Sequence, residues 1–156
     1  MTSGILRRAA AAVLLASLVA LAGCAAPDPD EQAARAASLS TIEIDGLGDV
    51  LVDGKGSVLY VFEPDQASAV TCTFTCTTNW PPLDAVAEST PAATGGVDAG
   101  LLATLPNPGG GEVITYNGWP LYRYDADRSP GDARGQATTL NGGAWYVMAP
   151  DGEPIR

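Results

Sequence analysis

The sequence predicts an all-β protein, with one small domain of two pseudo-symmetric β-hairpin repeats packed as a sandwich or a barrel-like sheet. Three observations support this prediction. Residues 59–65 (LYVFEPD) and 121–127 (LYRYDAD) share a pattern of Leu, Tyr, a second aromatic residue and Asp. Each copy follows a glycine-containing turn between two short runs of strand-forming residues. No stretch after residue 40 has the periodicity of an amphipathic helix.

The first repeat contains a turn of sequence Asp-Gly-Lys-Gly at residues 53–56. Its glycines can adopt the positive φ values that tight hairpin turns require. β-Branched residues precede the turn at 50–52, and residues 58–62 form an apolar run after it. We therefore expect these two runs to pair as the two strands of a hairpin.

The second repeat carries Asn117-Gly118, which is a strong hairpin signal. We expect residues 112–116 to pair with residues 120–124 across this turn. Additional strands are expected where short apolar runs recur, at residues 41–44, 101–105 and 144–148.

Successive side chains of a strand point to opposite faces. Tyr60 and Phe62 should therefore share one face, as should Tyr122 and Tyr124. Arg123 falls on the opposite face of the second hairpin. We expect that hairpin to bury its aromatic face and to expose Arg123 to water.

The first 23 residues have the features of a bacterial lipoprotein signal peptide. A basic segment with Arg7 and Arg8 precedes an apolar run that is shorter than the roughly 20 residues needed to span a bilayer. The run closes on the sequence Leu-Ala-Gly before Cys24. We expect cleavage before Cys24 and acylation of this residue with diacylglycerol and a further acyl chain. A plain secretory signal is the alternative interpretation.

The rest of the chain divides into a tether and a domain. Residues 24–40 contain Pro, Ala and acidic residues without apolar periodicity, so we interpret them as the lipidated Cys24 and a flexible tether. The domain is expected at residues 41–156. Its first repeat should span about 45–86 and its second about 100–150.

Charge excludes one class of partner. After cleavage, six basic residues remain against 18 acidic residues, a net charge of −12. Such a surface repels phosphate backbones, so we expect no nucleic-acid partner. Anionic lipid headgroups are repelled as well. Membrane attachment, at the extracytoplasmic face, is therefore expected to depend on the lipid anchor.

The chain contains no histidine, and this excludes several catalytic and metal sites. Triads that use Ser-His-Asp or Cys-His cannot form, nor can the usual zinc and copper sites. Cys72 and Cys76 remain after Cys24 is acylated, and in an exported protein we expect them to form a disulfide with each other. In a straight strand they would lie too far apart to do so, so the chain must turn between them if the bond forms.

Residues 60–65 and 122–127 both fit the pattern Y-x-(F/W/Y)-x-x-D. The chain resembles the bacterial family of predicted lipoproteins that carry this motif, also called the secreted repeat of unknown function. Further matching elements stand in the same order: Cys72 with Cys76, WPPL at 80–83, YNGWPLY at 116–122, Gly131, Asp132, Gly135 and Trp145. The resemblance implies an envelope location and a two-copy β domain, and no activity. Phe74 departs from it, because a small residue such as Gly is expected there.

The motif residues Tyr60, Phe62 and Asp65, and Tyr122, Tyr124 and Asp127, are expected to be structural. Asp at the end of a strand can accept backbone N–H groups of the following turn. A single active site seldom needs two copies of a motif. A ligand-binding or acid–base role for the two aspartates is the alternative.

Three other sites remain open as alternatives. Residues 125–132 (DADRSPGD) have alternating carboxylates like the start of a calcium loop, although Pro130 occupies the place of the expected glycine. Trp80, Trp119 and Trp145, with the tyrosines, could stack on sugars, although large aromatics are more often core. The Cys72/Cys76 pair could be redox-active, although no basic neighbour lowers a thiol pKa there.

These observations favour a membrane-anchored envelope lipoprotein of unknown molecular function. We interpret it as a non-catalytic module for binding or surface maintenance, with no metal and no cofactor besides the lipid on Cys24. A cell-surface protein or cell-wall glycan is the expected partner. The alternative is a metal-dependent or redox accessory protein of the envelope.

Overall fold

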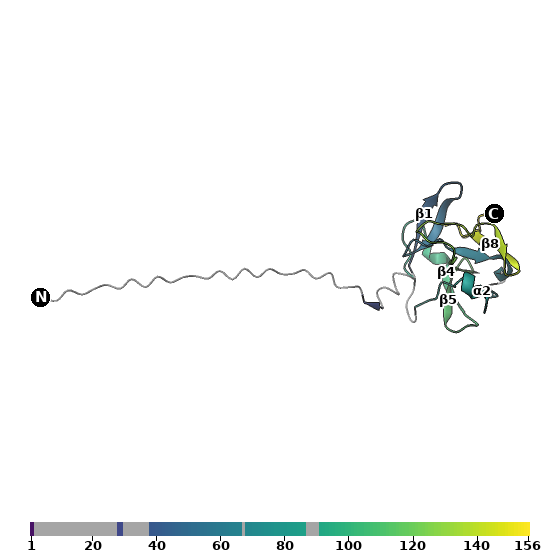
Figure 1. Ribbon diagram of the computed structural model, residues 1–156, viewed down its shortest axis with the longest axis horizontal. Helices are drawn as coiled ribbons and strands as arrows, with labels where there is room; N and C mark the ends of the chain where they lie inside the picture. The colour runs from purple at the N-terminus through teal and green to yellow at the C-terminus, as the bar shows by residue number, and fades with distance from the viewer. Residues whose placement is uncertain (2–27, 30–37, 67, 87–90) are drawn as a thin grey trace.

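The structure, a computed structural model, describes residues 1, 28–29, 38–66, 68–86 and 91–156. Within these ranges eight strands form three small antiparallel sheets (Figure 1). The all-β class is therefore confirmed. The sheets do not close into a barrel over the described residues, so the barrel-like arrangement is not formed. Cys24 and most of the tether lie outside these ranges.

The first sheet pairs β1 (Leu39–Ile44) with β2 (Gly48–Asp53). β1 begins two residues before the expected start of the domain. The reason is packing, because the Leu39 side chain is fully buried in the core. Its backbone is also held, since the Leu39 N–H donates to the carbonyl of Ala92 at 2.8 Å.

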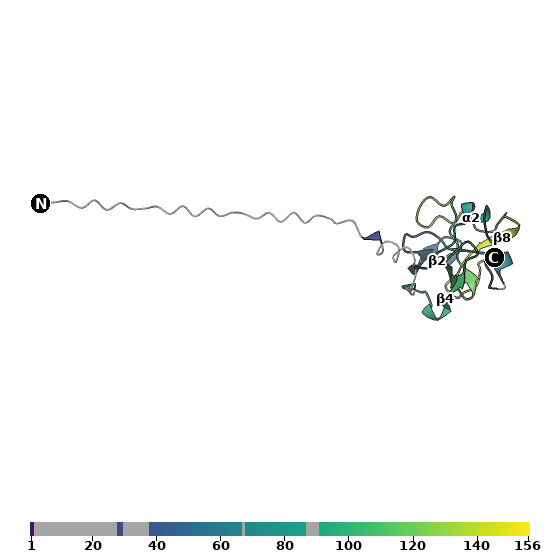
Figure 2. The same ribbon diagram turned by 90° about the horizontal axis from the view of Figure 1, so that it is seen from below.

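The second sheet has the order β3–β8–β7, with β3 at Tyr60–Phe62, β8 at Gly143–Val147 and β7 at Thr138–Leu140. The expected ladder between 50–52 and 58–62 is reduced to one bridge, Val52 with Val58, and the next residues pair elsewhere. β7 was not expected from the sequence. The C-terminal residues return to β8, and the two lie side by side in both views (Figures 1 and 2).

The third sheet has the order β4–β5–β6, with β4 at Leu102–Pro106, β5 at Glu112–Tyr116 and β6 at Trp119–Pro120. The expected Asn-Gly hairpin joins β5 and β6. Asn117 has φ 49° and Gly118 has φ 80°, the two positive values of a tight hairpin turn. β6 is shorter than expected because the chain crosses to the other repeat at Tyr122.

In the described ranges from residue 38 onward, the helices have three or four residues each: the 3-10 turns η1 (Glu63–Asp65) and η2 (Ala99–Leu101) and the helix α2 (Cys76–Asn79). In the part of the chain that the structure describes, no helix has the length and apolar character needed to span a membrane.

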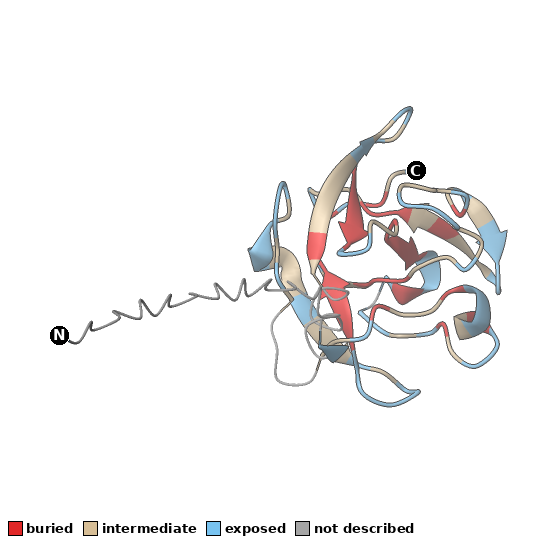
Figure 3. Ribbon diagram, turned by 60° about the vertical axis from the view of Figure 1, so that its left-hand side comes forward, coloured by how far each residue is buried: buried red, intermediate tan, exposed pale blue. Residues whose placement is uncertain are grey.

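Two hydrophobic clusters lie on opposite sides of β3. Tyr60 and Phe62 belong to one cluster, whereas Leu59 and Val61 belong to the other. The alternation expected along this strand is therefore observed, and all three residues of β3 are buried. Figure 3 shows the buried residues gathered in the interior of the domain and the exposed residues mostly in its outer turns. Burying each large side chain contributes roughly 1.5–3 kcal/mol. The two clusters are the main source of stability for a domain with so little regular structure.

Candidate functional site

The two sequence motifs meet backbone to backbone. Tyr60 N–H donates to the carbonyl of Tyr122, and Tyr122 N–H donates to the carbonyl of Tyr60, both at 2.9 Å. This reciprocal bridge relates the repeats by an approximate two-fold axis. Residues 62 positions apart in the sequence therefore occupy equivalent places.

The side chains of the motifs are paired crosswise. The Tyr60 hydroxyl donates to Oδ2 of Asp127 at 2.7 Å, and the Tyr122 hydroxyl donates to Oδ2 of Asp65 at 2.6 Å. Each motif thus supplies a hydroxyl to the carboxylate of the other. The local pattern of the sequence did not indicate this exchange, because it connects residues more than 50 positions apart.

Asp65 lies at the end of η1 and is fully buried. Its Oδ1 accepts the Thr71 N–H at 2.8 Å and also the Thr71 hydroxyl. Burial raises the pKa of this carboxyl, and the hydrogen bonds from Thr71 and Tyr122 oppose that rise. The expected turn-capping role is thus present, together with the unexpected tyrosine partner.

Asp127 is the equivalent residue of the second repeat and is only half-buried. Its Oδ1 accepts the backbone N–H of Arg134 at 3.0 Å. Burial raises the pKa of the Asp127 carboxyl, and the hydrogen bond from Tyr60 lowers it. The two aspartates therefore have the same architecture, but Asp65 is the more strongly enclosed.

The two tyrosines are held in the neutral form. Tyr60 and Tyr122 are fully buried. Burial raises the pKa of each phenol well above its usual value near 10, and the carboxylate that each contacts raises it further. Each hydroxyl is consequently a permanent hydrogen-bond donor at neutral pH.

Four aromatic rings form a continuous stack across the two-fold axis. Trp80 and Trp145 lie face to face at its centre, with ring centroids 3.8 Å apart. Phe62 stacks on the outer face of Trp145 at 4.3 Å, and Tyr124 stacks on Trp80 at 4.1 Å. Each repeat therefore contributes one tryptophan and one ring of its motif.

The ring stack rules out sugar stacking by two of the three tryptophans. Trp80 and Trp145 are fully buried, so neither can offer a face to a sugar. Trp119 is half-buried beside the second hydrophobic cluster. Only the end of the stack at Tyr124 is partly exposed, since Phe62 at the other end is 3% exposed.

The segment considered as a calcium loop uses its carboxylates on its own backbone. Asp132 Oδ2 accepts the N–H groups of Arg128 at 3.0 Å and Ser129 at 3.2 Å. Asp127 accepts from Tyr60 and Arg134, as described. In the described part of the chain, no group of three or more Cys, Asp or Glu residues has a spacing suited to a metal ion.

Cys72 and Cys76 form a disulfide, with Cα atoms 5.3 Å apart. The chain turns between them, as the bond requires, at Phe74 with φ 52°. This left-handed conformation favours glycine. The Phe74 side chain is 90% exposed.

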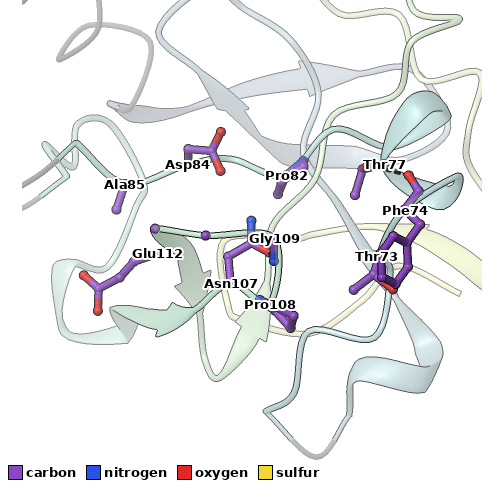
Figure 4. Close-up of a pocket in the computed structure, with 12 residues that line it drawn as sticks. Thr73, Phe74, Thr77, Pro82, Asp84, Ala85, Asn107, Pro108, Gly109 and Glu112 are labelled. Carbon is purple, nitrogen blue, oxygen red and sulfur yellow. Dashed lines mark hydrogen bonds between the residues drawn. The ribbon is translucent and has the colours of Figure 1, made fainter.

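A pocket of about 360 Å³ adjoins this disulfide ring. Figure 4 shows the ring residues Thr73, Phe74 and Thr77 on one side, the turn with Asn107, Pro108 and Gly109 beside them, and Pro82, Asp84 and Ala85 along the upper edge. We call it the disulfide pocket. Burial raises the pKa of the Asp84 carboxyl in its lining, and the charge of Arg123 opposes that rise.

A second pocket, of about 350 Å³, lies at the Tyr124 end of the ring stack. We call it the Tyr124 pocket. Its lining comes from the turn after β2, from Pro81 and from the second motif: Lys55, Ser57, Pro81, Arg123, Tyr124, Asp125, Asp127, Arg128, Ser129 and Pro130.

Arg123 was expected to be exposed, and the structure corrects this. Its Nε lies 2.6 Å from Oδ2 of Asp53, a carboxylate whose side chain is fully buried. Asp53 Oδ1 accepts the N–H groups of Lys55 and Ser57 at 2.8 and 2.9 Å. Asp53 was not identified as a site residue from the sequence. The only available signal was its place at the start of a turn, which is typical of Asp.

Comparison with known proteins gives one match. A family model described as a secreted repeat of unknown function matches residues 41–84 and again residues 104–149. The two matched segments correspond to the two repeats and together cover more than half of the chain. No curated protein and no solved structure matches the chain.

Proposed function

The chain belongs to the family of secreted repeats of unknown function, and from this premise we propose that it is a lipid-anchored envelope protein whose β domain is a non-catalytic binding module. Family membership indicates an extracellular or envelope location. The anchoring at Cys24, the absence of catalysis and the binding role are parts of the proposal.

The observation that carries the proposal is the occupation of both motif carboxylates. Asp65 receives donors from Tyr122 and Thr71, and Asp127 receives donors from Tyr60 and Arg134. A carboxylate whose oxygens are held by internal donors is poorly placed to exchange protons with a substrate. This arrangement supports a structural role for the repeated motif. We therefore assign the proposed binding function to the surfaces around the repeated motif.

The anchor rests on sequence and charge. Cys24 closes the apolar run after Leu-Ala-Gly, and two acyl chains suffice for lasting membrane attachment. A net charge of −12 after cleavage leaves little attraction to anionic lipids. We propose no cofactor besides this lipid.

Detergent phase separation of cells that express the full chain tests the anchor. Wild-type protein should enter the detergent phase, and Cys24→Ala should enter the aqueous phase. Cys72→Ser with Cys76→Ser is the matched control, because it changes cysteines without touching the anchor and should partition like wild type. Wild-type protein in the aqueous phase would refute lipid anchoring.

The alternative of a metal-dependent or redox accessory protein has its own test. We expect protein purified under thiol-blocking conditions to contain neither a stoichiometric metal nor free thiols at Cys72 and Cys76. Elemental analysis and thiol titration of the unfolded, unreduced chain measure both. A bound metal, or two free thiols that reoxidise reversibly, would favour the alternative.

A further inference from the structure

We propose that the Tyr124 pocket binds an acidic saccharide, with a sugar ring against Tyr124 and its anionic group near Lys55 and Arg128. The inference deepens the binding role proposed above by assigning its place and its ligand class. It rests on the proposed function only in that the module faces the outside of the cell.

Basic residues gather in the lining of the Tyr124 pocket. Five of the chain's eight basic residues lie in the described ranges, and three of them, Lys55, Arg123 and Arg128, line this one pocket. Arg123 is neutralised by buried Asp53, which leaves Lys55 and Arg128 as the cations that face Asp125 and Asp127. The pocket is therefore close to neutral in a strongly acidic protein, and an anionic group can contact two exposed cations there.

The two repeats allow a comparison for Arg128. The residue 62 positions before it, Gln66 directly after the first motif, is uncharged. The motif therefore folds without a cation at this place. Arg123 has a structural role, because it pairs with buried Asp53, and Lys55 lies in a turn whose backbone differs from that of Asn117, which has φ 49°. Arg128 is thus a cation that the fold of the motif does not require.

Tyr124 supplies an aromatic surface to the pocket. Trp80 covers one face of the Tyr124 ring, so the surface that Tyr124 contributes to the pocket is not the stacked one. Its equivalent, Phe62, is 3% exposed and is closely approached by Gly143. Within the described residues the Tyr124 hydroxyl has no hydrogen-bond partner. An open aromatic surface with a polar edge suits the C–H face and hydroxyl groups of a sugar.

Hydrogen bonds hold the backbone of the pocket lining in place. Buried Asp53 holds Lys55 and Ser57 by their N–H groups and Arg123 by its Nε. The segment that contains Pro130 of the lining is joined to the same turn, because the N–H of Gly131 donates to the carbonyl of Gly56 at 3.0 Å. The walls are thus fixed before any ligand arrives, which lowers the entropic cost of binding.

The exposed cations and the volume of the Tyr124 pocket restrict the class of ligand that it can bind. Among the described residues Lys55 has no ion-pair partner, and Arg128 is 71% exposed with a distant partner, Asp125, at 3.8 Å. Both can approach an incoming anion. A volume of about 350 Å³ is at the lower end for small-molecule sites, which suits one or two sugar rings.

Isothermal titration calorimetry on the full-length chain in detergent, at low ionic strength, tests the proposal. The probes are tetragalacturonate, neutral maltotetraose and inorganic phosphate. We expect tetragalacturonate to bind at least about tenfold more tightly than either control, and its affinity to fall with added salt. Equal binding of maltotetraose would refute the anionic requirement, and equal binding of phosphate would refute the saccharide. No binding of tetragalacturonate would refute both.

Variants locate the site. Lys55→Gln and Arg128→Gln should each weaken tetragalacturonate binding by about fivefold, the value of an exposed charge contact, and together by about 20-fold. Both side chains point to solvent, so folding should be unaffected. Arg134→Gln is the matched control, since this arginine is 65% exposed and outside the pocket lining. Equal loss in the control and in the pocket variants would refute the location.

Tyr124→Ala should abolish binding, whereas Tyr124→Phe keeps the ring and should retain most of it. If Tyr124→Ala does not fold, the two charge variants still decide the location. If wild-type protein enters the detergent phase but does not bind tetragalacturonate, only this inference is refuted. If it binds tetragalacturonate but stays in the aqueous phase, only the lipid anchor is refuted.

Discussion

The hydroxyl of Tyr60 lies 2.7 Å from Oδ2 of Asp127, a residue of the other repeat, and the same contact recurs between Tyr122 and Asp65 at 2.6 Å. Duplication of the motif therefore has a physical use. Neither copy satisfies its own aspartate, so one repeat alone would bury an incompletely bonded carboxylate. We therefore expect each copy to need the other for a stable core.

Removing the hydroxyl of either Tyr60 or Tyr122 should destabilise the protein, and the loss should be larger for Tyr122, whose partner Asp65 is the more buried aspartate. Tyr122→Phe leaves the fully buried Asp65 without one donor and should cost about 2–3 kcal/mol, whereas Tyr60→Phe, beside half-buried Asp127, should cost about 1–2 kcal/mol. Urea unfolding of the full chain measures both.

A double-mutant cycle separates the crossed pairing from a pairing within each motif. Tyr60→Phe combined with Asp127→Ala should show a coupling of about 1 kcal/mol, because the two groups share a hydrogen bond. Tyr60→Phe combined with Asp65→Ala should be nearly additive, because these groups share no partner. Strong coupling in the second pair and none in the first would contradict the structure.

Alkaline pH should unfold the protein through the same tyrosines. The folded state holds Tyr60 and Tyr122 neutral, with pKa values raised above the unfolded value near 10. The stability that they contribute is complete below pH 10 and is lost as the pH rises, because only the unfolded state releases these protons. The free energy of unfolding should fall by roughly 2.7 kcal/mol per pH unit above pH 10 for two such groups.

Measurement of the unfolding free energy against pH, together with tyrosinate absorbance, checks this expectation. Tyr60→Phe or Tyr122→Phe should halve the contribution of these groups to the slope. Tyr146→Phe is a suitable control, because this tyrosine is half-buried and its ring contacts Arg156. Native protein in which Tyr60 and Tyr122 titrate near pH 10 would contradict the burial described above.

Local signals in the sequence predicted the elements whose structure is set by near neighbours. The Asn117-Gly118 hairpin formed as expected, because the turn itself dictates its pairing. The expected ladder between 50–52 and 58–62 formed only near its turn, with the Val52–Val58 bridge and the Leu59 N–H donating to the carbonyl of Leu51. It stops there because both backbone groups of Tyr60 are taken by Tyr122. No periodicity within ten residues of Tyr60 carries that information.

The site was predictable only in part for the same reason. The motif residues were recognisable because they recur, and the expectation that they are structural came from the repetition. The partners were not recognisable, since Asp53 meets Arg123 across 70 positions of sequence. The strand β7 was not predicted because its three residues are half-buried or exposed and give no apolar pattern.

The rings of the core pack so closely against Gly135 that a side chain at this position would clash with them. A Cβ at this position would lie 2.6 Å from Trp80 and 2.9 Å from Tyr60, both rings of the core. Gly135→Ala should therefore cost about 1–3 kcal/mol through overpacking. Gly96→Ala is the control, because its nearest neighbours lie at 3.5 Å and neither glycine has a positive φ. Equal stability of the two variants, measured by thermal unfolding, would argue against the packing described.

The disulfide should contribute little to global stability. It closes a ring of only five residues, which corresponds to about 2 kcal/mol in the chain-entropy model. Cys72→Ser with Cys76→Ser should therefore lower the free energy of unfolding by no more than about 2–3 kcal/mol and leave the far-ultraviolet circular dichroism unchanged. A chain that fails to fold without the bond would show that the ring organises the domain.

Phe74 lies within this ring in a conformation that favours glycine, with φ 52°, while its side chain is 90% exposed. The exposed ring contributes little burial, and the left-handed backbone costs about 1 kcal/mol for any residue with a Cβ. Phe74→Ala should consequently leave stability almost unchanged, because it removes the ring and keeps the Cβ. Phe74→Gly should be up to about 1 kcal/mol more stable than Phe74→Ala. The disulfide limits the entropy that a glycine at residue 74 adds to the unfolded chain. The advantage of Phe74→Gly over Phe74→Ala should therefore shrink when Cys72 and Cys76 are replaced by Ser.

Urea unfolding of Phe74→Gly and Phe74→Ala, each with the disulfide and with both cysteines replaced by Ser, measures these differences in stability. If Phe74→Gly is the less stable of the pair in the oxidised protein, residue 74 does not adopt the left-handed conformation in solution.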